Sequence, residues 1–113
     1  MVARAEMLDE AARLERQAEF RQRSADDLRR WAGDLAGGLR AATGWVDGGV
    51  WDAQPAVDVR EATRDTLHDI EAGAEDILQV ARRLDGEADD LRDEAWLLRR
   101  DAEADDTFGF LGL

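Results

Sequence analysis

The sequence predicts an all-α fold: a long antiparallel helix-turn-helix hairpin that dimerises into a four-helix bundle. Three observations predict it. Alanine is the commonest residue, with 20 copies in 113 residues, and there is one proline. Apolar residues recur every seven positions in two long stretches, as they do along the seam of a coiled coil. A short glycine-rich segment separates the two stretches, so the helices are expected to be antiparallel neighbours.

The first predicted helix covers about residues 2–42, where Ala, Leu, Arg, Glu and Gln dominate. A series of mostly large residues recurs every seven positions, with Arg21 as its break: Met7, Leu14, Leu28, Leu35 and Ala42. A second series follows it by four positions and is mostly alanine: Ala11, Ala18, Ala25, Ala32 and Leu39. Small residues in alternate layers allow two helix backbones to approach closely.

The predicted loop covers about residues 43–55. Glycines between Gly37 and Gly49 end the first helix within that stretch. Asp52 is a suitable N-cap for the second helix, and Pro55 fits its first turn.

The second predicted helix covers about residues 56–104, so that residues 1–104 form one helical-hairpin domain. Its large series is Ile70, Ile77, Leu84, Leu91 and Leu98, and its small series is Leu67, Ala74, Ala81, Ala88, Ala95 and Ala102. Gly73 and Gly86 are interpreted as tolerated positions, or as points of close helix contact.

The two series also predict which residues face each other. If the chain bends near residue 49, the numbers of facing residues add to about 98. Leu14 is then expected opposite Leu84, and Ala18 opposite Ala81.

A single two-helix seam provides little core, so the apolar residues outside it are predicted to bind a partner. The predicted partner interface consists of Phe20, Trp31, Leu78 and Trp96. The alternative is that these side chains cover the edges of the seam within the chain.

An apolar tail, residues 105–113, follows the hairpin. Asp105 and Asp106 are expected to end the second helix, because acids are unfavourable near a helix C-terminus. The predicted docking residues of the tail are Phe108, Phe110, Leu111 and Leu113. Three alternatives for the tail are compatible with the sequence: it docks on a partner, it folds back on its own bundle, or it continues into a further domain.

Composition argues against several functional classes. The chain has no Cys and one His, and its formal net charge of −12 disfavours binding to nucleic acid. No apolar run is long enough to span a membrane, and no nucleophile, phosphate loop or cofactor motif is found. We therefore expect a protein that is not an enzyme, with no cofactor and no metal site. His68 is expected at the surface, and Arg29 and Arg30 are expected to form ion pairs with nearby acids.

The length, the hairpin and a tryptophan in its turn resemble the WXG family, the ESAT-six-like helical hairpins exported by type VII secretion. Trp51 corresponds to the tryptophan of the Trp-x-Gly turn, and Ala53 stands where that family has glycine. Trp45 is a second candidate for the turn tryptophan. The family's Tyr-x-x-x-Asp/Glu export signal has no counterpart, since the chain contains no Tyr.

The resemblance implies a type VII secretion substrate or its targeting partner, acting as a homo- or heterodimer with a related hairpin or a larger secreted protein. Such a chain is cytoplasmic before export and leaves without a cleaved signal peptide. A different function is also compatible with the sequence. Residues 57–113 carry a net charge of −10, as expected for a cytoplasmic acidic coiled-coil chaperone or inhibitor of a basic partner protein.

Overall fold

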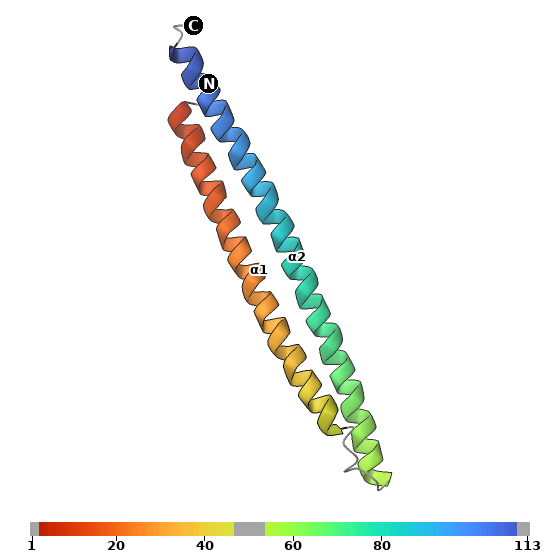
Figure 1. Cartoon of the computed structure of the whole chain (residues 1–113). Helices are drawn as coiled ribbons and strands as arrows, with labels where there is room; N and C mark the ends of the chain where they lie inside the picture. The colour runs from red at the N-terminus through yellow and green to blue at the C-terminus, as the bar shows by residue number, and fades with distance from the viewer. Residues whose placement is uncertain (1–2, 47–53, 111–113) are drawn as a thin grey trace. The chain divides into compact units, whose positions relative to one another are not determined.

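The computed structural model describes residues 3–46 and 54–110, and the side chains of residues 3–44 and 57–104. Helix α1 spans Arg4–Val46 (43 residues) and helix α2 spans Gln54–Phe110 (57 residues) (Figure 1). The described residues contain no strand, and the two helices pack against each other as a hairpin. The predicted all-α hairpin is therefore confirmed.

The helix ends differ from the predicted ones. Helix α1 continues four residues past residue 42, through Gly44 to Val46. Helix α2 begins at Gln54 and continues past residue 104 to Phe110, so the backbone of most of the predicted tail is helical. Acids and a single glycine each cost about 1 kcal/mol or less in a helix, which is too little to end a long one because each added residue completes a further hydrogen bond.

The seam between the helices is built from the two predicted series. Nine alanines and Leu14 are buried among the described residues, and all belong to those series: Ala11, Leu14, Ala18, Ala25, Ala32, Ala74, Ala81, Ala88, Ala95 and Ala102. The large residues beside them are mostly half-buried. The heptad interpretation of the sequence is therefore confirmed.

The hairpin divides into two compact units, each made of one segment of α1 and one of α2. The terminal unit comprises Met1–Ala25 and Arg82–Leu113, and the loop-side unit is Asp26–Ala81. In the terminal unit Ala11, Leu14 and Ala95 form a buried cluster, and Leu91 and Leu98 pack against it.

The register of the two helices differs from the predicted one. In the terminal unit Arg21 Nε lies 3.1 Å from Glu87 Oε2, and Gln22 Nε2 donates a 3.0 Å hydrogen bond to Asp85 Oδ1. The numbers of these partners add to 108 and 107, not to about 98. In the loop-side unit Leu39 and Leu67, whose numbers add to 106, line the same hollows.

The prediction that Leu14 faces Leu84 and Ala18 faces Ala81 is therefore wrong by about one heptad. A seven-residue repeat matches itself equally well after a shift of seven, so the repeat alone does not select a register. The predicted register rested on a bend near residue 49. The numbers of the observed partners are centred on about 54, which is the first residue of α2, whereas α1 ends at Val46, so the two helices are not placed symmetrically about that centre.

Gly73 and Gly86 do not mark close contacts between the helices. A Cβ atom built at Gly73 or Gly86 meets no other atom within 4 Å outside its own local helix backbone. The interpretation of these two residues as points of close approach is therefore wrong, and the alternative that they are tolerated positions remains.

Candidate protein-binding site

The loop-side unit has a hollow on each side of its seam, and Leu39 and Leu67 line both. These two residues occupy the small series, where the neighbouring layers have alanine. Two leucines that share one layer hold the helix backbones further apart than two alanines do. Beside the two leucines, small residues of α1 line these hollows: Ala36, Gly38, Ala42 and Thr43.

One hollow, the Trp31 groove, is predominantly apolar and has a volume of about 380 Å³. It is lined by Trp31, Asp34, Leu35, Gly38, Leu39, Ala42, Leu67 and Ile70. The groove is open to solvent: Trp31 is 58% exposed and Ile70 is 39% exposed. Asp34 is the one ionisable residue in this lining. An open apolar groove with a large aromatic at its edge is typical of a helix-docking surface.

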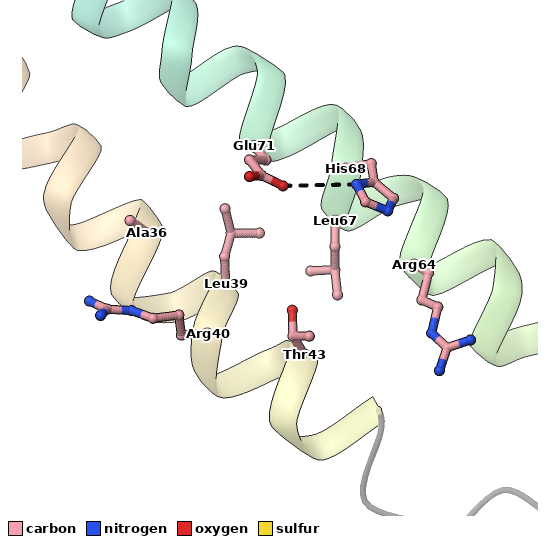
Figure 2. A pocket seen from close by; sticks show the side chains of 8 residues that line it. All are labelled: Ala36, Leu39, Arg40, Thr43, Arg64, Leu67, His68 and Glu71. Atoms are coloured by element: carbon pink, nitrogen blue, oxygen red, sulfur yellow. Dashed lines mark ion pairs between the residues drawn. The ribbon is translucent and has the colours of Figure 1, made fainter.

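The hollow on the opposite flank, the His68 hollow, has a volume of about 500 Å³ and is more polar. Figure 2 shows the eight side chains that line it: Ala36, Leu39, Arg40, Thr43, Arg64, Leu67, His68 and Glu71. His68 Nδ1 lies 3.8 Å from Glu71 Oε2, and the His68 side chain is 78% exposed, so the prediction of a surface histidine is confirmed.

The four residues of the predicted partner interface do not share one flank of the hairpin. In the loop-side unit Trp31 lines the Trp31 groove, whereas Leu78 lies two helical turns after Glu71, on the flank of the His68 hollow. Leu78 is half-buried. A single partner helix lying on one flank therefore contacts only part of the predicted set.

The terminal unit shows the same division. Phe20 is 69% exposed and lies next to Arg21, on the flank where Arg21 pairs with Glu87. Trp96 is 60% exposed and lies one turn before Arg99, which bonds to Glu15 on the other flank. The Trp96 ring also has a contact on its own helix, since the guanidinium carbon of Arg100 lies 5.1 Å from the ring centroid.

The two arginines that precede Trp31 form ion pairs with acids on the same helix surface. Arg29 Nη1 lies 3.0 Å from Asp26 Oδ1, and Arg30 Nη2 lies 3.4 Å from Asp27 Oδ1. The predicted pairing with nearby acids is confirmed, with Asp27 as the partner of Arg30.

In the terminal unit a hydrogen bond from Arg13 lowers the pKa of Glu10, and the Coulomb attraction of the same guanidinium acts in the same direction. Spacings of three residues place both charges on one helix face, where such pairs support the helix.

Several residues of the predicted turn motif and of the predicted docking tail lie outside the part of the chain whose side chains are described. Trp45 belongs to α1, and Phe108 and Phe110 belong to α2, by backbone alone. Trp51 and Ala53 of the predicted turn motif, and Leu111 and Leu113 of the tail, lie outside the described residues altogether.

Metal ligation and membrane insertion find no support in the described part of the chain. Among the described side chains, those of residues 3–44 and 57–104, no group of three or more His, Cys, Asp or Glu is placed to hold a metal ion. Neither described helix combines the length and the apolar character needed to cross a membrane.

Comparison of the chain with protein-family models, with curated proteins and with solved structures finds no match.

The groove itself was not among the sequence predictions, although Trp31 was. On the sequence alone, Leu35, Gly38 and Ile70 count only as seam or helix-end residues. The signal that could have found the groove is the pair Leu39 and Leu67. They are the large residues in otherwise alanine series, and both lie toward the loop.

Proposed function

We propose that this protein is a non-enzymatic interaction protein whose hairpin pairs with a second helical hairpin, either its own copy or a related chain. The observation that carries the proposal is the Trp31 groove, an apolar surface open along one flank. Further support comes from the seam, in which nine of the ten buried residues that the structure describes are alanine. Alanine buries little apolar surface, so a second layer of helices adds the apolar burial that the hairpin alone lacks.

The biological setting proposed is type VII secretion, with the chain acting as a substrate or as the targeting partner of another exported protein. This part rests on the resemblance to WXG hairpins, together with the all-helical hairpin fold. The chain has no Tyr for the family's export signal, so the proposal assigns that signal to the partner. The protein is then cytoplasmic until the pair is exported.

The charge of the chain supports a second candidate function, that of a cytoplasmic acidic chaperone or inhibitor. The excess of acids over arginines gives a net charge of −12, most of it in residues 57–113. Such a protein masks a basic partner by charge and is not exported. An export assay in cells with and without a working type VII system separates the two functions.

The pairing itself is tested by light scattering on the complex purified from its native cells. The expected mass is at least that of two chains, and Trp31→Ala reduces it to that of a monomer. Trp96→Ala serves as the matched control, because Trp96 is equally exposed but lies outside the groove. A monomer with a cooperative thermal transition, obtained from native cells with the wild-type sequence, contradicts the proposed function.

A further inference from the structure

The border of the Trp31 groove is acidic on both helices. Asp34 lines the groove from α1, and Asp27 lies one heptad before it. On α2, Asp69 lies two positions after Leu67 of the small series, as Asp34 lies two positions after Ala32 on α1, and Asp76 lies one heptad after Asp69. All four side chains are exposed. Residues seven apart lie on the same helix face, so each helix presents two aspartates along this flank.

Arginines of the loop-side unit do not line the Trp31 groove. Arg40 and Arg64 line the His68 hollow on the opposite flank. Arg30 pairs with Asp27 at 3.4 Å, and this pair lies toward one end of the groove. The two flanks therefore differ in character: one is apolar with an aspartate border, and the other is polar with charges of both signs.

This asymmetry decides between two occupants of the groove. In a symmetric dimer each groove meets its own copy, because a two-fold axis places the same surface patch on both sides. Asp34 and Asp69 of one chain would then meet the same aspartates of the other, and opposed like charges disfavour such a complex. A helix with basic residues beside its apolar stripe fills the same groove and neutralises the same border.

From these observations we infer that the Trp31 groove binds an amphipathic helix whose apolar stripe is bordered by Arg or Lys, rather than a second copy of this chain. The inference rests on the proposed function and specifies its partner. Gly38 and Ala42 offer space for apolar side chains of the incoming helix, and the aspartates beside the groove, Asp34 and Asp69 above all, select its charge. Such a partner is recognised by residues spaced three and four apart along one face.

The test uses the full chain and two labelled helical peptides of about four heptads that share one leucine stripe. One peptide has arginines beside the stripe and the other has glutamates at the same positions. Fluorescence anisotropy at about 0.15 M NaCl measures their binding. The arginine peptide is expected to bind at least about tenfold more tightly than the glutamate peptide.

Two charge-reversed double variants locate the effect. Asp34→Arg with Asp69→Arg is expected to weaken binding of the arginine peptide about tenfold and to strengthen binding of the glutamate peptide. The control, Glu61→Arg with Glu75→Arg, makes the same change in net charge on the face that carries His68. It is expected to change binding of either peptide by less than about threefold.

Three results overturn the inference. One is that the two peptides bind equally or that neither binds. Another is that both double variants weaken the arginine peptide alike, which indicates attraction to net charge alone. The third is a wild-type homodimer in sedimentation at the same salt concentration that Trp31→Ala dissociates. That result contradicts the inference but leaves the proposed pairing of hairpins intact. A protein that is purified from its native cells as a monomer contradicts the proposed function itself.

Discussion

Arg21 of α1 reaches across the seam of the terminal unit and pairs with Glu87 of α2, with 3.1 Å between Nε and Oε2. Arg21 occupies a position that other layers fill with leucine, and its side chain is 34% exposed. In the register predicted from the sequence, the residue that faces Arg21 would be the apolar Ile77. The break in the leucine series therefore helps to select one register among those that the heptads allow.

Replacing Arg21 by leucine is expected to stabilise the hairpin. An exposed ion pair contributes about 0–1 kcal/mol, whereas a leucine that is buried in the seam contributes about 1.5–3 kcal/mol at most. We expect Arg21→Leu to raise the free energy of unfolding in urea by about 1 kcal/mol. Arg21→Gln removes the charge without adding apolar surface and is expected to lower stability slightly. If both variants are destabilised alike, the ion pair is the larger contribution.

The alanine seam predicts a cost for any larger side chain within it. Ala88 is fully buried, and a leucine there forces the helices apart. We expect Ala88→Leu to destabilise the protein by about 1–3 kcal/mol, visible as a lower melting temperature in circular dichroism. The control is Ala62→Leu on the exposed surface of α2, which is expected to leave the melting temperature nearly unchanged. Equal effects at both positions would show that the seam is not closely packed.

Gly86 lies inside α2 with open space where a Cβ atom would stand. Alanine restricts the unfolded chain and favours the helix, so Gly86→Ala is expected to stabilise the protein by about 0.5–1 kcal/mol. Differential scanning calorimetry measures the change, and Gly73→Ala should act in the same direction. A loss of stability at either position would restore the interpretation of these glycines as points of close contact.

Gly37 and Gly38 form a matched pair for testing the groove. Both have open space where a Cβ atom would stand, but only Gly38 lines the Trp31 groove. Leucine favours the helix over glycine at either site. We expect Gly38→Leu to weaken binding of the arginine-bordered peptide about tenfold by filling the groove, and Gly37→Leu to leave binding unchanged. Equal binding by the two variants would place the docking surface elsewhere.

Much of the fold follows from the sequence because heptad spacing is a strong signal. The alanine series identified each buried alanine of the seam, and the glycine-rich segment separated the helices. The register did not follow, because shifts of seven residues preserve the heptads and only contacts such as Gln22 with Asp85 distinguish them. The end of α2 did not follow either, because Asp105 and Asp106 weaken a helix without ending it.

The candidate site was predicted only in part, for a geometric reason. Spacings along one helix place Phe20 on the same helix face as Trp31, and Leu78 on the same face as Trp96, but they do not say which flank of the hairpin each pair occupies. That assignment requires knowing how one helix is rotated against the other. The pairing of Arg99 with Glu15 supplies this information for the terminal unit, and the two hollows supply it for the loop-side unit.

The placement of the helical glycines also has a dynamic consequence. Of the six described helical glycines with open space around them, five belong to the loop-side unit: Gly33, Gly37, Gly38, Gly44 and Gly73. Each lowers local helix stability by about 1 kcal/mol relative to alanine, so backbone amides there exchange with solvent through local opening sooner than those beside the Ala11, Leu14 and Ala95 cluster. The segment that carries the groove is thus expected to open locally more often than the segment around that cluster, and a bound partner is expected to slow the exchange of its amides by ordering it.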